Sequence, residues 1–162
     1  MSSQKELRVK DLRFRYGSSG ASLGPLSFEA GSGEIWAVLG SNGAGKSTLF
    51  KLIDGELKPK SGSVSYQGTS DLIPQGASIP GRLSVRQTFE YLAQLRGVPR
   101  QDRAERIEEA LRLVSLKEQE NARVGSLSGG QYRRVVVGQA LIAKPEILLM
   151  DEPSAGLDLE QR

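Results

Sequence analysis

The sequence contains neither cysteine nor histidine. Without cysteine, the chain can form no disulfide bond and no metal site built from thiolates. Without histidine, it lacks the side chain that most often serves as a general base or as a transition-metal ligand near neutral pH. Any acid–base chemistry must therefore fall to other side chains, above all to carboxylates.

Long apolar runs are also absent. The longest clear runs cover residues 35–39 and 147–150, whereas a membrane-spanning helix needs about 20 predominantly apolar residues. Residues 1–6 contain no apolar segment, so the sequence predicts no secretory signal. The length of 162 residues, with 38% apolar and 25% charged residues, suits one globular domain. Ordinary surface lysines and arginines explain the small net charge of +3 better than an anionic partner does.

The first part of the chain has the alternation of half-exposed strands. Apolar and polar residues alternate over residues 6–14, with one slip between Val9 and Leu12 that indicates a β-bulge. Residues 26–29 and 63–66 predict further short strands of the same kind. Such strands are typical of an antiparallel sheet with one face in water.

Other segments indicate an α/β core. Residues 35–39 and 147–150 are continuously apolar, which predicts strands buried on both faces. Helical spacing of apolar residues predicts helices over residues 48–53 and 131–143, and two more between residues 84 and 123. The pair between residues 84 and 123 indicates a helical insertion into the α/β core.

A glycine-rich segment directly follows the first apolar run: Gly40-Ser41-Asn42-Gly43-Ala44-Gly45-Lys46-Ser47-Thr48. The pattern Gly-x4-Gly-Lys-Ser, between a strand and a helix, is that of a phosphate-binding P-loop. Glycines let backbone N–H groups converge on phosphate oxygens, and the N-terminus of the next helix adds positive partial charge. Lys46 is expected to contact the β- and γ-phosphates, and the Ser47 hydroxyl to bind Mg²⁺. The segment predicts a nucleoside triphosphate with a magnesium ion as the ligand.

The second apolar run leads into two carboxylates, Asp151 and Glu152. An aspartate at the end of a strand can hold Mg²⁺ or its water shell, because this hard cation prefers oxygen ligands. Glu152 is then placed to polarise the attacking water. In a chain without histidine it is the leading candidate for the general base. Beside a P-loop, this pair predicts hydrolysis of the nucleotide.

A third motif, Leu127-Ser128-Gly129-Gly130-Gln131, lies between the P-loop and the carboxylates. It looks like the signature motif of ATP-binding cassette (ABC) proteins, and the chain resembles their nucleotide-binding domain over residues 7–162. The resemblance implies an ATPase that uses ATP and Mg²⁺ to power transport. It also implies the fold class: an α/β, RecA-like P-loop NTPase core with an N-terminal antiparallel β subdomain and a helical insertion.

The resemblance further implies a division of the single domain, residues 1–162, into three parts. Residues 1–82 would form the β subdomain and P-loop core, and residues 83–127 the helical subdomain. Residues 128–162 would carry the signature helix, the Walker B strand that ends at Asp151, and the D-loop.

The family's pattern assigns further roles to matching residues. Tyr16 resembles the aromatic residue that stacks on adenine, for which Phe14 is the alternative. Gln75 resembles the Q-loop glutamine, which would contact Mg²⁺ and the attacking water. The expected catalytic residues are therefore Gln75, Lys46 and Glu152. The expected metal ligands are Gln75, Ser47 and Asp151. Residues 154–158 resemble the D-loop, which runs along a dimer interface.

The resemblance also implies partners. Ser128, Gly129, Gly130 and Gln131 would bind the ATP held by a second nucleotide-binding domain, identical or different, in a head-to-tail dimer. Transmembrane permease subunits would be separate chains, which places the domain in the cytoplasm, on the cytoplasmic face of the membrane. No nucleic-acid partner is expected.

Several interpretations remain open at this point. Residues 83–88 and 137–141 look more like the ATPases of ABC-2 type exporters than those of importers. The family's switch histidine has no counterpart, and the sequence ends at Arg162, so we expect a C-terminally truncated domain rather than a naturally short variant. The alternative functions are an ABC ATPase that acts on ribosomes or DNA, and a nucleotide-binding fragment without turnover.

Overall fold

The computed structural model describes residues 7–76 and 78–152. These residues form two compact units. The first, here called the β unit, contains residues 7–72 and 146–151. The second, the helical unit, contains residues 73–145 and Glu152. Within the described ranges, no helix is long and apolar enough to cross a membrane.

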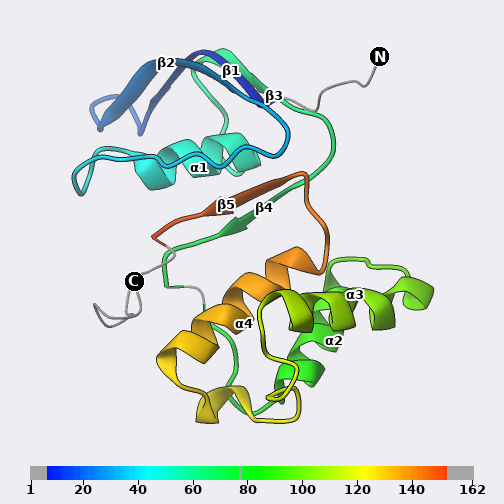
Figure 1. Ribbon diagram of the computed structural model, residues 1–162. Coiled ribbons are helices and arrows are strands. Elements are labelled where there is room, and N and C mark those ends of the chain that lie inside the picture. The colour runs from blue at the N-terminus through cyan, green and yellow to red at the C-terminus, as the bar shows by residue number, and fades with distance from the viewer. Residues whose placement is uncertain (1–6, 77, 153–162) are drawn as a thin grey trace. The chain divides into compact units, whose positions relative to one another are not determined.

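The β unit is built on an antiparallel sheet of three strands with the order β2-β1-β3 (Figure 1). The strands are β1 (Leu7–Arg15), β2 (Ser22–Ala30) and β3 (Ser61–Ser65). The pairing of β1 with β2 shifts register between Val9 and Leu12, as the predicted bulge requires. Asp11, inside this shift, has a φ of 45°, which aspartate adopts more readily than most residues. The antiparallel sheet predicted for this part of the chain is confirmed.

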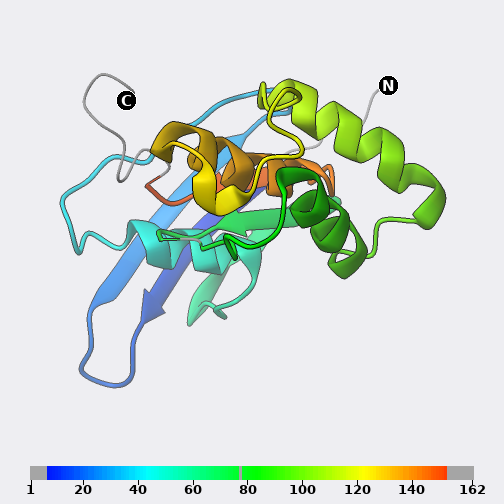
Figure 2. The same cartoon turned by 90° about the horizontal axis from the view of Figure 1, so that it is seen from below.

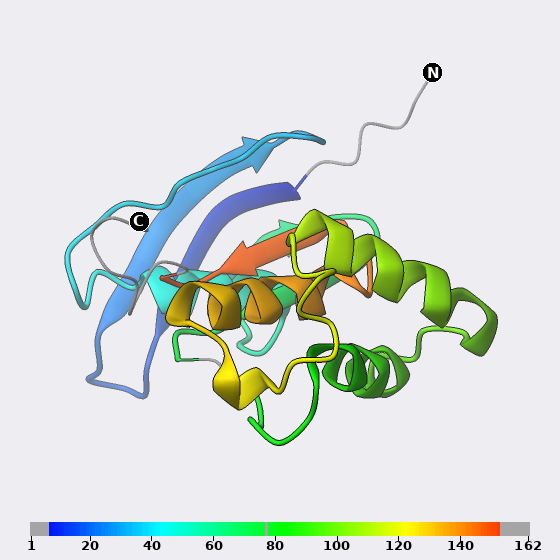
Figure 3. The ribbon, with the colours of Figure 1, turned by 60° about the horizontal axis from the view of Figure 1, so that its bottom comes forward.

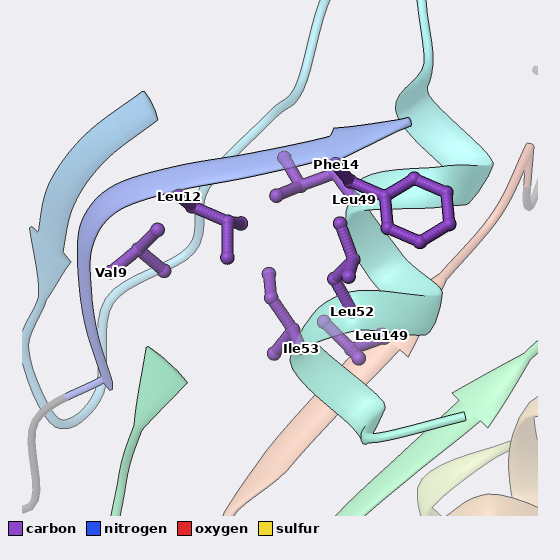
Figure 4. Packing of buried hydrophobic residues seen from close by; sticks show 7 residues of the cluster. All are labelled: Val9, Leu12, Phe14, Leu49, Leu52, Ile53 and Leu149. Carbon is purple, nitrogen blue, oxygen red and sulfur yellow. The ribbon is translucent and has the colours of Figure 1, made fainter. Parts of the chain in front are cut away.

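The core of the β unit forms around helix α1 (Lys46–Asp54), which lies between the three-stranded sheet and a pair of strands (Figure 1). That pair is β4 (Ser70–Ile73) and β5 (Ile147–Met150). Side chains from β1, α1 and β5 meet in one buried cluster, shown in Figure 4: Val9, Leu12, Phe14, Leu49, Leu52, Ile53 and Leu149. Gly55, with a φ of 86°, ends the helix, which extends the predicted segment 48–53 by two residues at its start and one at its end.

The strand predicted over residues 35–39 is wrong. Ile35 is 99% exposed and Leu39 is 90% exposed, and no described strand pairs with this segment. The segment is held instead by Trp36, whose ring stacks on Phe28 and whose indole N–H donates to the Glu34 carboxylate at 2.8 Å. A strand forms only where a neighbour completes its hydrogen bonds, and an apolar run does not say which segment that neighbour is.

Burial of residues 147–150 on both faces is also wrong. These residues do form β5, but within it only Leu149 is buried, and Met150 is 36% exposed. In the described chain, β5 pairs with one strand only, β4, which was not predicted from the sequence of residues 70–73. With a single neighbour, β5 keeps part of its surface open.

The helical unit packs three helices against one another (Figures 2 and 3). They are α2 (Val85–Leu95), α3 (Arg100–Leu113) and α4 (Gly129–Leu141), with a short 3₁₀ helix, η1 (Val124–Ser126), before α4. The two helices predicted between residues 84 and 123 and the one predicted at 131–143 are confirmed, the last with shifted bounds. The unit extends on both sides of residues 83–127 and includes α4.

A group of charged residues links α2 to α3 and to the segment that follows it. Arg86 forms ion pairs with Glu108 and Glu120, and Lys117 reaches the same two carboxylates at 2.6 and 3.1 Å. Hydrogen bonds from Lys117 and Arg86 lower the pKa of Glu108, and those from Arg86 and Lys117 lower the pKa of Glu120. Both carboxylates therefore stay charged in the folded unit at neutral pH.

Helices α4 and α2 approach each other closely at Gly138. A Cβ atom on Gly138 would lie 2.5 Å from Cζ of Phe89 and 3.3 Å from Cγ1 of Val114. Phe89 is fully buried, so its ring has no open space into which it could move. Glycine at position 138 lets the two helices meet over this ring.

Substitution of Gly138 should therefore destabilise the helical unit. We expect Gly138→Ala to lower the free energy of unfolding by about 1–3 kcal/mol through overpacking, more than the gain of up to about 1 kcal/mol in helix propensity. Urea unfolding followed by circular dichroism measures the change. Gly129→Ala is the matched control, because a Cβ atom there meets nothing within 4 Å. Equal stability of the two variants would contradict the packing account, and Phe89→Leu should partly rescue Gly138→Ala.

Candidate functional site

The P-loop begins beyond the exposed 35–39 segment and ends in the first turn of α1. Gly45 is the residue that starts the helix, with a φ of 95°. This backbone angle favours glycine, and a Cβ atom there would also lie 2.9 Å from Cδ1 of Leu23, so that side chain would have to shift. Leu49 N–H donates to the Gly45 carbonyl at 2.9 Å and starts the helical hydrogen bonds. The N–H groups before it lack helical partners, as in any first turn, and these are the groups that bind anions.

The Lys46 ammonium points back into its own loop. It donates to the Gly40 carbonyl at 2.8 Å and to the Ser41 carbonyl at 3.0 Å. The cation is thus already placed among the loop residues that were predicted to surround the phosphates. An anion in the loop can take over from these two neutral acceptors, because a bond between two charged groups is the stronger one.

Tyr16 directly follows β1 and lies close to the P-loop. Its hydroxyl is 3.2 Å from Oγ1 of Thr48, and its ring meets Phe14 edge-to-face with centroids 4.8 Å apart. Tyr16 is 47% exposed, whereas Phe14 is buried in the core of the β unit. Of the two aromatic candidates for stacking on a base, only Tyr16 is accessible, and Phe14 is excluded.

Two oxygen donors predicted to bind Mg²⁺ belong to the β unit. Ser47 is exposed in the first turn of α1, and the carboxylate-bearing Asp151, at the end of β5, is 6% exposed. In the described ranges, no group of three or more histidine, cysteine, aspartate or glutamate side chains could hold a metal ion. A hydroxyl and one carboxylate fit Mg²⁺, which takes few protein ligands and completes its shell with phosphate oxygens and water.

Gln75 and Glu152, which are 77 residues apart in sequence, meet in the helical unit. Gln75 Nε2 donates to Glu152 Oε2 at 2.6 Å. Gln75 comes just after the end of β4 and Glu152 just after the end of β5, and the two paired strands run in the same direction (Figure 1). This bond turns the amide so that its nitrogen faces the carboxylate, and the amide oxygen remains as the atom suited to a metal or a water.

The backbone of Glu152 is unusual. Its φ is 50°, in the left-handed region that few residues other than glycine, asparagine and aspartate occupy. Arg133 Nη2 donates to the Glu152 carbonyl at 2.9 Å. Arg133 is not among the predicted site residues, and nothing in the sequence around it indicates a contact with a residue that is 19 positions away.

The signature segment begins α4 with a capping box. The Ser128 hydroxyl accepts from Gln131 N–H at 3.3 Å, and Gln131 Oε1 accepts from Ser128 N–H at 3.0 Å. Ser84 and Gln87 form the same arrangement at the start of α2. The spacing Ser-x-x-Gln could have revealed both boxes from the sequence. Gln131 thus has a structural role in its own chain, beside the predicted role toward a nucleotide.

The predicted residues fall into two groups, one in each unit. The β unit holds Tyr16, the P-loop and Asp151. The helical unit holds Gln75, the signature segment and Glu152. Residues 154–158, predicted to form the D-loop, lie outside the described residues.

Comparison with protein families gives one match that covers most of the chain. The model of a family described as "ABC transporter" matches residues 23–155, a range that includes the P-loop, Gln75, the signature segment and both carboxylates. The energy-coupling factor transporter ATP-binding protein EcfA of Methanocaldococcus jannaschii is 34% identical over 94% of this chain and 60% of its own length. The methionine import ATP-binding protein MetN of Mesorhizobium japonicum is 36% identical over 98% of this chain and 47% of its own length.

Among solved structures, this chain is similar to CbiO1 from Clostridium perfringens, described as part of the ABC transporter complex CbiONQ. The TM-score is 0.84 at 28% sequence identity, over 96% of this chain and 68% of that one. The α/β P-loop NTPase fold class is thereby confirmed. This chain spans about half to three-fifths of the length of the curated relatives it matches.

The exposed ring of Tyr16 allows a test of its role. If Tyr16 stacks on a base, Tyr16→Ala should weaken ATP binding by about 1–3 kcal/mol, roughly fivefold to 150-fold in Kd. Tyr16→Phe keeps the ring, removes the contact with Thr48 and should bind ATP about as well as the parent. Titration of a fluorescent ATP analogue measures both. Equal affinity of Tyr16→Ala and the parent would contradict the stacking role.

Proposed function

Because this chain belongs to the ABC transporter family, we propose that it binds and hydrolyses ATP to power a transporter whose membrane subunits are separate chains. The observation that carries the proposal is the 2.6 Å bond between Gln75 and Glu152. These are the two residues predicted to contact the attacking water, and they meet although they are 77 positions apart.

The β unit would hold the nucleotide. Tyr16 supports the adenine ring, and the residues of the P-loop surround the phosphates: Gly40, Ser41, Asn42, Gly43, Ala44, Gly45, Lys46, Ser47 and Thr48. Lys46 exchanges its bonds to the Gly40 and Ser41 carbonyls for bonds to the β- and γ-phosphates. Ser47, Asp151 and Gln75 would supply oxygen ligands to Mg²⁺. When bound, Mg²⁺ neutralises negative charge on the phosphate oxygens.

Hydrolysis would use the carboxylate of Glu152. Glu152 accepts a proton from the attacking water as the water oxygen bonds to the γ-phosphorus and the bond from that phosphorus to the β–γ bridging oxygen breaks. Gln75 holds Oε2 of the carboxylate, which sets the direction of the other oxygen, Oε1. Lys46 stabilises the charge that develops on the phosphate oxygens.

A second nucleotide-binding domain would complete the site. Ser128, Gly129 and Gly130 begin α4, and a helix N-terminus favours an anion. In a head-to-tail dimer these residues, with Gln131, bind the γ-phosphate of the neighbour's ATP. Bound ATP then becomes part of the interface and favours association by mass action. Association of the two domains on ATP binding, and their separation after hydrolysis, would move the permease subunits on the cytoplasmic face of the membrane. Similarity to ABC-2 type exporters remains a prediction.

The proposal can be tested with two substitutions. Lys46→Ala removes the cation of the P-loop and should raise the Kd for ATP at least tenfold. Glu152→Gln removes the base but keeps the size of the side chain, so ATP affinity should stay near that of the parent while kcat falls at least a hundredfold. ATP binding is measured by titration, and turnover by phosphate release.

The outcomes separate the possible functions. Unchanged ATP affinity in Lys46→Ala would contradict the P-loop assignment. ATP binding without hydrolysis, in both the parent and Glu152→Gln, would indicate a nucleotide-binding role without turnover. Co-purification with a membrane protein supports the transporter role, whereas only ribosomal or DNA partners would contradict it.

A further inference from the structure

Two successive residues of α4 hold the segments that carry the proposed catalytic groups. The Tyr132 hydroxyl accepts from the backbone N–H of Ile79, just beyond Gln75, at 2.8 Å. Arg133 Nη2 donates to the Glu152 carbonyl at 2.9 Å. Their partners are 53 and 19 residues away in sequence, so neither bond belongs to the helix itself. Both bonds lie within the helical unit.

Glu152 has a backbone conformation that its surroundings must hold. A φ of 50° is unfavourable for glutamate, because its Cβ atom comes close to the following carbonyl oxygen. Such conformations persist where neighbouring contacts fix them. Gln75 binds the end of the side chain, at Oε2. Arg133 binds the main chain, at the carbonyl. The two contacts together fix both ends of the residue.

We propose that Arg133 is a positioning residue for ATP hydrolysis, which holds the main chain of Glu152 so that its carboxylate stays in line with the Gln75 amide. The inference rests on the proposed role of Glu152 as the general base. Arg133 stands one turn after Ser128 on the same helix. Arg133 thus connects the backbone of Glu152 to α4, whose first residues are proposed to bind the γ-phosphate of the ATP in the second chain. Tyr132 ties the segment after Gln75 to the same turn of α4.

Arginine suits this role for physical reasons. Its guanidinium is charged at every relevant pH and presents its donors in a fixed plane, so it sets a direction as well as a distance. The Arg133 side chain is half-buried, which restricts it further. Lysine keeps the charge and a donor at the end of a flexible chain, so Arg133→Lys should retain part of the function.

The next residue provides a matched control. Arg134 donates from Nη1 to the carbonyls of Val114 and Ser115, at 3.3 and 3.0 Å. It is an arginine of the same helix with the same kind of bond, to a segment that carries none of the proposed catalytic groups. Loss of Arg134 therefore measures what the removal of a guanidinium from α4 does to the fold alone.

The test compares ATP hydrolysis by the parent, Arg133→Met, Arg133→Lys and Arg134→Met. Arg133→Met keeps a flexible, unbranched side chain but removes the guanidinium donors. It should lower kcat about tenfold to hundredfold, because a small displacement of a reacting group is enough for such a loss. KM and ATP affinity should stay near the parental values, because the P-loop is unchanged. Arg133→Lys should recover part of kcat. Arg134→Met should keep the parental kcat and KM, even where its thermal midpoint falls as far as that of Arg133→Met.

Two results would overturn the proposal. One is a parental kcat in Arg133→Met, whether or not KM rises, and the other is an equal loss of kcat in Arg134→Met at equal thermal stability. Glu152→Gln distinguishes this failure from failure of the proposed function. If Glu152→Gln is inactive and Arg133→Met is normal, only the positioning role is wrong. If Glu152→Gln is as active as the parent, the assignment of the base is wrong and the positioning role falls with it.

Discussion

The packing of α1 against β5 is the constraint on which the nucleotide-binding half of this site depends. Leu49, Leu52 and Ile53 of α1 share one buried cluster with Leu149 of β5 (Figure 4). Leu49 stands one turn after Lys46, and Leu149 just before Asp151. Burial of a leucine side chain contributes about 1.5–3 kcal/mol, so this cluster can hold the P-loop and the acidic strand end in place without any polar contact between them. A hydrophobic core, rather than the charged groups themselves, therefore sets the positions of the predicted phosphate and metal ligands.

In the helical unit, which also has an apolar core around Phe89, polar contacts hold the segments that carry the proposed catalytic residues. Here polar contacts from one helix, α4, reach the segments on which Gln75 and Glu152 stand. Hydrogen bonds are directional, so they suit groups whose orientation matters for chemistry, whereas apolar packing suits groups that need only a place. The two groups of predicted site residues are thus held in different ways. Ligands for phosphate and metal stand on a packed core, and the proposed base is held by specific donors at both its ends.

The sequence predicted much of this arrangement because its signals were local. Glycine spacing identified the P-loop, alternation with one slip located the bulge in β1, and helical spacing located α2 and α3. The failures concern partners that are distant in sequence. Residues 35–39 look like a buried strand, but pairing depends on a neighbouring strand that the run itself cannot specify. For the same reason no pattern in the sequence could reveal the bond between Arg133 and Glu152, although the capping boxes, set by four adjacent residues, could have been predicted.

In the proposed dimer, Lys46 and Glu152 act on ATP in one chain while Ser128 completes the site of another. Sedimentation velocity of the Glu152→Gln variant, with and without ATP and Mg²⁺, measures this association, because ATP that is bound but not hydrolysed should hold two copies together. We expect a shift from monomer to dimer on addition of ATP, and loss of that shift when Ser128→Arg is added to the variant. A chain that binds ATP with the expected affinity and remains monomeric, or a dimer that the Ser128 substitution leaves unchanged, would contradict it.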